Sequence, residues 1–278
     1  MNGLPKKVIR NAFPLGAMAA LLAIFCMAVG APVISTYSPA DGSLGERLRP
    51  PLTPGHLLGT DPLGRDVLSR IIFGARVSVA VGLASVLIAG VFGTILGLIS
   101  GFYGGWLDRI IMRFVDMQLS FPFVVLSLTI AAVLGSSFQN IIITLAISSW
   151  VVYARLVRGE VLSLREKQFV QAAFTLGLPD GRIIVMHILP NIIQPIIVLG
   201  SLEVGRMIIG EAAISFLGYG IQPPVPTWGN MLGEGRDYMT TAWWLTVFPG
   251  MVIMITTLAV NILGDRLRDA LDPKLRLQ

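Results

Sequence analysis

The stretch VSVAVGLASVLIAGVFGTILGLISG, residues 77–101, runs through the chain without one acidic or basic side chain. About 20 such residues in a helix cross the hydrocarbon core of a bilayer. The whole sequence shares this character, with 54% hydrophobic and 13% charged residues and a mean hydropathy of +0.75. Soluble domains carry about 25% charged residues. The sequence therefore predicts an all-α integral membrane protein.

Apolar runs long enough to cross a bilayer recur along the chain. We expect six transmembrane helices, over residues 13–34, 77–101, 120–137, 140–157, 191–217 and 242–264. The first run also has features of a secretory signal, because basic residues precede it and Ala28 to Gly30 resembles a cleavage site. We favour a retained span, since the apolar stretch continues to Ile34.

The distribution of Lys and Arg predicts the orientation. With the N-terminus in the cytoplasm, the inner segments hold 14 of these residues and the outer segments hold 6. Because cytoplasmic loops carry the excess of positive charge, both termini are predicted to be cytoplasmic. The chain then divides into a first helix with an outer amphipathic segment (1–76), a transmembrane domain (77–264) and a cytoplasmic tail (265–278).

A polar stretch, QAAFTLGLPDGRIIVMHILPN at 171–191, interrupts the apolar runs on the predicted cytoplasmic side. Ser163 and Glu166 have the spacing of a capping box, which predicts a helix over 164–176. Gly177 is a helix stop, since glycine adopts the left-handed conformation at little cost. A second short helix is expected over 181–189, and Pro190 suits the first turn of the next span. Two interpretations remain open at this point: an elbow lying on lipid headgroups, or a surface that docks a partner.

The spacing of Ala172-Ala173, Gly177 and Leu189-Pro190 resembles the Glu-Ala-Ala loop of permease subunits in ATP-binding-cassette (ABC) importers. This resemblance implies that the loop forms a coupling helix seated in a groove of an ATPase subunit. The sequence departs from the pattern in two places, with Gln171 at the usual Glu position and His187 at the usual Ile position. A neutral Gln still forms hydrogen bonds, although it forms no salt bridge. The implied contact residues are Gln171, Ala172, Ala173, Gly177, Leu189 and Pro190.

The segment 56–82, on the predicted outer side, is expected to form an amphipathic helix that leads into the second span. Asp61 is its expected N-cap and Pro62 its first residue. Asp61 with Arg65, and Asp66 with Arg70, have the i,i+4 spacing that favours ion pairs. The glycines of this segment do not form a phosphate loop, because the Lys-Ser/Thr pair is missing.

This segment, together with ISFLGYGIQPPVPTWGNML (214–232) and LGDRLRDALDPKLR (263–276), resembles the C-type subunit of the dipeptide/oligopeptide/nickel branch of these permeases. The resemblance implies the type I importer fold in a bacterial inner membrane, with half of a pathway for dipeptides or oligopeptides. It also implies the following partners: a second permease, two ATPase subunits that bind ATP and Mg, and a periplasmic or lipid-anchored binding protein. Nickel chelates, glutathione and other peptide-like solutes are the alternative substrates.

Two further sets of residues lie within the predicted spans. The stripe Ser85, Ala89, Gly93, Gly97 and Gly101 repeats every four residues, which allows close helix packing, within this subunit or with a partner. Charged residues inside a membrane are costly and therefore candidates for function. Glu203, Arg206 and Glu211 form such a group, either lining a polar pathway or forming a structural pair at an interface.

Other classes of function fit the sequence less well. An ion-coupled secondary transporter predicts inverted repeats and matching broken helices, neither of which is present in the sequence. An intramembrane enzyme is disfavoured because His56 and His187 are the two histidines and neither has a nucleophile motif nearby. A single cysteine, Cys26, argues against a metal cluster. The net charge of +5 does not indicate a nucleic-acid surface. We therefore expect no catalytic residue, metal or cofactor in this chain.

Overall fold

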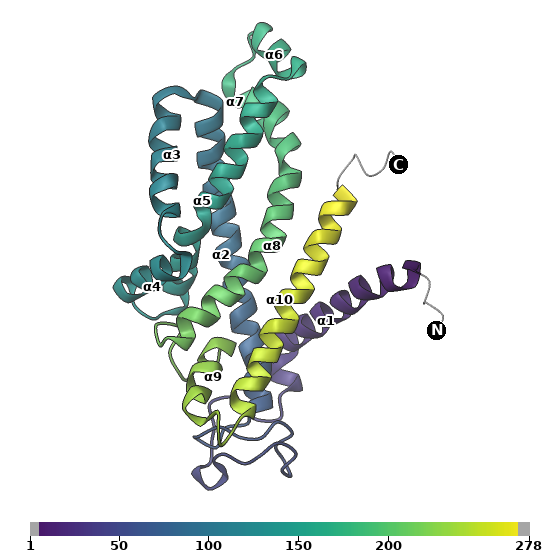
Figure 1. Cartoon of the computed structure of the whole chain (residues 1–278), viewed down its shortest axis with the longest axis vertical. Helices are drawn as coiled ribbons and strands as arrows, with labels where there is room; N and C mark the ends of the chain where they lie inside the picture. Colours follow the sequence, from purple (N-terminus) through teal and green to yellow (C-terminus); the bar gives the residue numbers. More distant parts are fainter. Residues whose placement is uncertain (1–5, 272–278) are drawn as a thin grey trace.

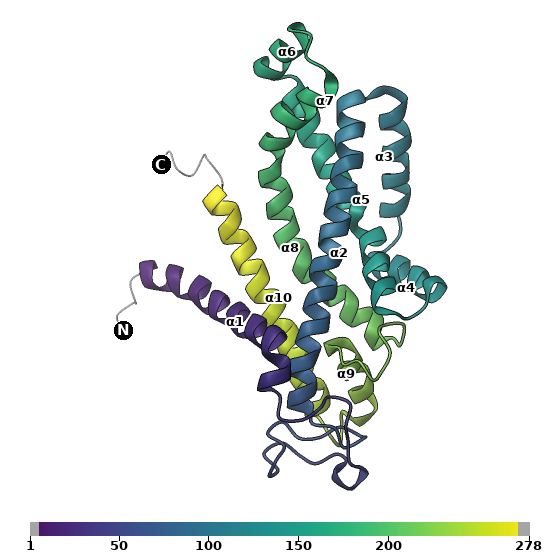
Figure 2. The same ribbon diagram turned by 180° about the vertical axis from the view of Figure 1, so that it is seen from behind.

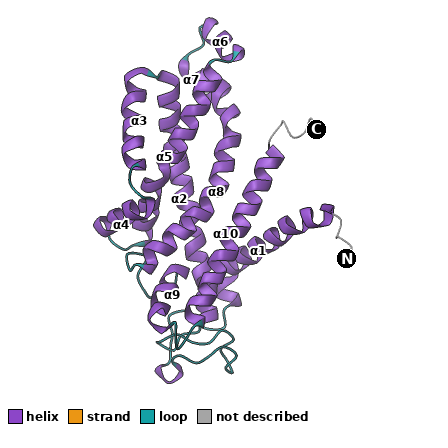
Figure 3. Cartoon of the chain, in the orientation of Figure 1, coloured by secondary structure: helices purple, strands orange, loops and turns teal. Residues whose placement is uncertain are grey.

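The computed structural model describes residues 6–271, and no β-strand forms among them beyond isolated bridges in residues 42–66 (Figures 1 and 3). Five helices are long and apolar enough to cross a membrane, and a sixth span results if one bent helix pair is counted as a single span. The prediction of an all-α membrane protein is therefore confirmed, and five of the six predicted spans correspond to single long helices among the described residues. The last residues of the predicted tail, 272–278, lie outside the described part of the chain.

The first two helices meet at one end of the molecule. α1 (Lys6–Ile34) matches the predicted first span at its C-terminal end and packs there through Ile24 and Ala28 against α2 and α10. α2 (Val67–Tyr103) is longer than the predicted second span. It begins at Val67, where the Asp66 carboxylate accepts a hydrogen bond from the Ser69 amide at 2.8 Å. The expected helix start at Asp61 and Pro62 is therefore wrong.

The third predicted span, 120–137, is also wrong as a single helix. Residues 105–119, expected as a loop, form the helix α3 (Gly105–Leu119), and α4 (Phe123–Leu134) follows after a bend of 96°. The bend falls at Phe121-Pro122, because proline cannot continue a helix and holds the preceding residue out of the helical region. α4 alone has 12 residues, too few to cross the hydrocarbon core.

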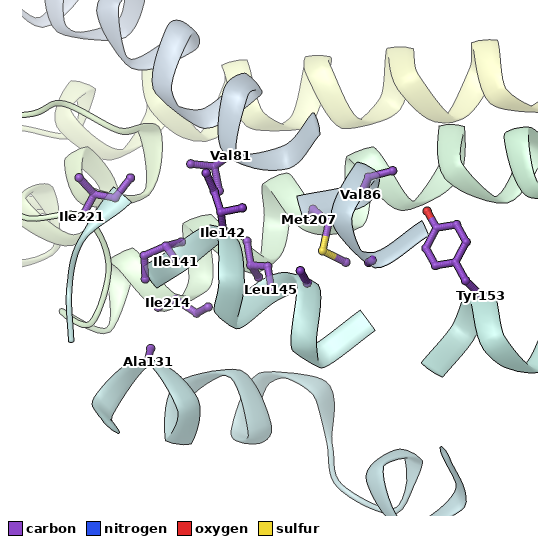
Figure 4. Packing of buried hydrophobic residues seen from close by; sticks show 12 residues of the cluster. Val81, Val86, Ala131, Ile141, Ile142, Leu145, Tyr153, Met207, Ile214 and Ile221 are labelled. Carbon is purple, nitrogen blue, oxygen red and sulfur yellow. The ribbon is translucent and has the colours of Figure 1, made fainter. Parts of the chain in front are cut away.

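α5 (Phe138–Arg165) lies along α2 for most of its length (Figure 2). The main core forms where these two helices cross α8 and α4. Figure 4 shows side chains of this core pointing toward one another from the four helices. They include Val81, Ile141, Leu145, Met207 and Ile214.

The second half of the chain contains α6 (Gln168–Thr175), α7 (Asp180–Ile183), a π-helical turn (Ile184–Ile188), α8 (Leu189–Phe216), α9 (Trp228–Gly235) and α10 (Trp244–Leu271). α6 and α7 lie at the opposite end of the molecule from the α1–α2 loop (residues 35–66) and α9 (Figure 1). α10 runs from the α9 end toward the α6 end. The last two predicted spans match α8 and α10 within a few residues at most ends.

Candidate functional site

The helix that carries Gln171, Ala172 and Ala173 is α6, within what we call the α6 loop (residues 166–188). The capping box predicted at Ser163 is wrong, because α5 continues through this residue to Arg165. Val161 and Leu164 pack in the cluster that holds the loop, so tertiary contacts extend α5 past the expected break. α6 begins after Lys167, which provides no side-chain cap.

Gly177 ends α6 with the predicted left-handed backbone, at φ +71°. The Leu178 amide donates to the Ala173 carbonyl at 3.2 Å, and the Gly177 amide donates to the Phe174 carbonyl at 3.0 Å. These two bonds form a Schellman motif, which satisfies carbonyl groups that the helix end would otherwise leave free. The chain therefore turns sharply at a fixed place.

The separate helix predicted over 181–189 is not present. α7, the π turn and α8 form one helical segment over 180–216. In the π turn, the Leu189 amide donates to the carbonyl of Ile184, five residues back. Pro190 lacks an amide hydrogen, and the wider turn before it accommodates the proline ring without ending the helix. Pro190 thus lies in the first turn of α8, as predicted, although no break separates it from α7.

The two faces of α6 differ in burial. Val170 and Ala173 are buried against the ends of α2 and α5, with Ala173 only 2% exposed. Gln171 and Ala172 face outward, as does Leu176, which is 79% exposed. The Gln171 side-chain amide donates to the Arg165 carbonyl at 2.6 Å, so this side chain helps to hold the loop to α5. The α6 loop is firmly attached on one face and uncovered on the other.

The intramembrane charges on α8 form two separate groups. Arg206 donates to Glu203 at 3.2 Å and lies over the ring of Phe123, 4.7 Å from its centre. Glu203 is buried, and the side chain of Arg206 is 42% exposed. Glu211 does not meet Arg206; it accepts hydrogen bonds from Ser78 at 3.2 Å and Ser215 at 2.7 Å. The Glu203–Arg206 pair thus reaches the surface, whereas Glu211 ties α8 to α2.

At the opposite end of the molecule, the α1–α2 loop is held by buried ion pairs. The Asp61 carboxylate accepts from Arg65 and from Arg70, each at 2.6 Å. Both arginines also donate to Glu234 at the end of α9, at distances of 2.6 to 3.0 Å. The predicted Asp61–Arg65 pair is present, whereas Arg70 pairs with Asp61 and Glu234 instead of Asp66.

The segment 218–241 contains α9 and is packed into the same end. Trp228 is fully buried, and its indole nitrogen donates to the Ile71 carbonyl of α2 at 3.0 Å. Glu234 attaches the far end of α9 to the α1–α2 loop. The α1–α2 loop and the segment 218–241, far apart in the sequence, are therefore packed together at this end of the molecule.

The stripe of small residues on α2 faces α5 within this chain. A Cβ atom added to Gly97 would lie 2.7 Å from the Ala154 carbonyl oxygen, and one added to Gly101 would lie 2.8 Å from Val161. Ser85 donates to the Ile142 carbonyl at 3.3 Å. Such contacts leave no room for larger side chains between the two helices, with Ala89 and Gly93 continuing the same buried stripe.

Comparison with known proteins identifies the family. The family described as "binding-protein-dependent transport system inner membrane component" matches residues 93–277. The chain belongs to this family. It is therefore a multi-pass membrane permease of a binding-protein-dependent transport system, and the alternatives of a secondary transporter and an intramembrane enzyme are set aside.

Curated relatives resemble this permease over nearly its whole length. It is 44% identical to the dipeptide transport system permease protein DppC of Alkalihalophilus pseudofirmus, covering 98% of this chain and 89% of that protein. It is 41% identical to the glutathione transport system permease protein GsiD of Pectobacterium atrosepticum, covering 98% and 90%. The di/tripeptide transport system permease protein DppC of Pseudomonas aeruginosa is 42% identical, covering 94% and 88%.

Solved structures share the fold. The inward-facing MetNI methionine ABC transporter contains a chain that superimposes with a TM-score of 0.61 at 17% identity, covering 74% of this permease and 97% of that chain. An amino acid ABC transporter gives a TM-score of 0.58 at 16% identity, with coverages of 73% and 95%. The predicted ABC importer permease fold is thus confirmed.

Sequence reasoning missed two ion pairs that attach α3 to α5. Arg158 donates to Asp108 at 2.7 Å, and Arg155 pairs with Asp116. The signal was the i,i+4 and i,i+8 recurrence of charged and polar residues over 105–119, which is typical of a helix with one polar face. That recurrence was obscured because the segment was interpreted as a loop between spans.

Proposed function

We propose that this permease forms half of an import pathway for dipeptides or oligopeptides and couples it to ATP hydrolysis by partner ATPase subunits. The uncovered face of α6 carries the proposal, because an anchored helix with exposed apolar residues provides a ready docking surface. A second permease would supply the other half of the pathway. The ATPase subunits would bind ATP and Mg, so this chain would catalyse no reaction itself.

The continuous helical segment over 180–216 supports the coupling. A displacement of the α6 loop is passed directly to α8, since no flexible linker lies between them. Rigid movement of helices is a common way to switch a pathway between two sides. In this arrangement α6 and both chain ends face the cytoplasm, and the α1–α2 loop faces a binding protein outside the bacterial inner membrane.

Peptides are the proposed substrates because the relatives that cover most of this chain are named for dipeptide, di/tripeptide and glutathione transport. Glutathione is itself a small peptide-like solute, so it is the main alternative. Uptake of a labelled dipeptide and of labelled glutathione, by the complex reconstituted with its binding protein, distinguishes the two.

Affinity purification of the tagged permease from its native membranes tests the coupling. We expect a second permease and ATPase subunits to co-purify, and Ala172→Arg to remove the ATPase subunits while the second permease stays bound. Ala172 is the right position because it is exposed, whereas a charge at buried Ala173 would disrupt the loop itself. Leu57→Arg, at an exposed position of the α1–α2 loop, is the matched control. ATPase subunits that remain bound to Ala172→Arg would contradict the proposal.

A further inference from the structure

A cavity of about 680 Å³ lies between α5 and α8, with α3 and α10 at its edges. Its walls are formed by apolar side chains, among them Val152, Leu156, Val198 and Leu202. Three other cavities, of about 370 to 490 Å³, are lined by uncharged residues. This one differs because two arginines, Arg155 and Arg268, lie in its lining.

The charged residues that line this cavity are both basic. Arg155 is paired with Asp116, yet its side chain is 55% exposed and a guanidinium has five N–H donors, so most of them remain available. Arg268 reaches the cavity from α10, close to the point where Gln194 of α8 donates to the Leu271 carbonyl at 2.6 Å. Two guanidinium groups in the lining, with the Asp116 carboxylate beside one of them, favour an anion in the cavity.

Along α8, in the direction away from the α6 loop, the wall of the cavity leads to the Glu203–Arg206 pair. Gln194, Val198 and Leu202 lie four residues apart on the face that lines the cavity, and Arg206 is the next residue in this series. From Gln194 the α8 wall of the cavity runs about 12 Å to Leu202, past the apolar Val198, and Arg206 follows one turn further. A ligand with a carboxylate at one end and apolar side chains behind it matches this order.

We infer that Arg155 and Arg268 bind the C-terminal carboxylate of a peptide in the cavity, on the side of the membrane where α6 lies. Guanidinium groups bind carboxylates through paired, charge-assisted hydrogen bonds, and the apolar walls accept the peptide side chains. The inference rests on the proposed function, since it places the substrate in this subunit's half of the pathway.

The test reaches the site from the α6 side, which bypasses selection by the binding protein. The whole complex is reconstituted in phosphatidylcholine vesicles with α6 facing the lumen, and dialanine or its C-terminal amide is enclosed at rising concentration. Uptake of labelled dipeptide with loaded binding protein is then measured. We expect enclosed dialanine to slow uptake and the amide to require about tenfold higher concentration, the loss expected for one charge-assisted hydrogen bond.

We expect the tenfold preference for dialanine over its amide to be lost in Arg155→Gln and in Arg268→Gln. Each variant is compared with its own uptake rate in empty vesicles. Arg113→Gln, on an exposed part of α3 outside the cavity lining, is the control and should keep it. Equal inhibition by dialanine and its amide in the unmodified complex would overturn the inference while leaving the proposed function intact. An effect of the variants only in vesicles with phosphatidylglycerol would show a lipid site and would also overturn it. Absence of any dipeptide uptake would instead contradict the proposed function.

Discussion

The α1–α2 loop and the α6 loop lie at opposite ends of the same helices and are built in opposite ways. The α1–α2 loop buries Asp61 and Arg65, and Asp61 pairs both with Arg65 and with the buried Arg70 at the start of α2. The α6 loop has one buried face and leaves Phe169 and Leu176 exposed. One end is therefore held by buried ion pairs, whereas the other is held through the apolar face of one short helix. Both ends expose apolar side chains, among them Leu52 and Leu63 at the first end. The difference predicts that substitutions in the ion pairs of the first end lower the stability of the whole chain. Substitutions in the buried face of α6 are expected to affect the α6 loop alone.

The largest effect is expected from Asp61→Ala. This change leaves the two buried guanidinium groups with Glu234 as their one shared carboxylate, and removing one partner of a buried ion pair costs about 3–5 kcal/mol. The melting temperature of the purified permease in mild detergent should fall by roughly 10 °C. Asp41→Ala, at an exposed position of the same loop, is the control. Similar melting temperatures for the two variants would show that the ion cluster does not stabilise the fold.

A smaller and local effect is expected from Ala173→Asp. Ala173 lies among apolar side chains, and burial of an unpaired carboxylate costs about 2 kcal/mol or more. The α6 loop should open locally, so its amide hydrogen exchange should become about 30-fold faster while the melting temperature stays unchanged. Ala172→Asp, on the exposed face, should leave exchange as it is. A large fall in melting temperature for Ala173→Asp would contradict the contrast between the two ends.

The smallest effect is expected from Gly177→Ala. An added Cβ at Gly177 would meet no atom within 4 Å, so the cost comes from the left-handed backbone alone, about 1 kcal/mol. Exchange of the amides that form the Schellman motif should become about fivefold faster. Gly181→Ala, equally unhindered but within α7, should be neutral or slightly stabilising. Equal behaviour of the two variants would mean that the glycine turn does not fix the end of α6.

The sequence predicts the elements that rest on composition and local chemistry. Long apolar runs give the spans, because length and hydropathy decide whether a helix crosses a bilayer. The stop at Gly177 follows from the backbone preference of one residue. The charge pair Glu203–Arg206 follows from spacing on a single helix.

Features that depend on tertiary contacts could not be predicted in the same way. Asp61 and Asp66 are both good N-cap residues, and the choice between them depends on the ion pairs that Asp61 forms with distant arginines. α3 was interpreted as a loop because its charges are explained only by their partners on α5. The continuous path from α7 to α8 depends on a π turn, which sequence patterns do not reveal.

The unbroken helical segment over 180–216 is also long enough to act as a lever. At 1.5 Å per residue it is about 55 Å long, well beyond the hydrocarbon thickness of about 30 Å. Gly205 lies close against Asn261 and Thr257 of α10, and Gly210 lies close against Phe123 and Leu145. With the pivot near Gly205, the arm toward the α6 loop is more than twice as long as the arm toward Phe216. A rigid tilt about this pivot would carry a sideways movement of the α6 loop to the other end reversed in direction and reduced to less than half.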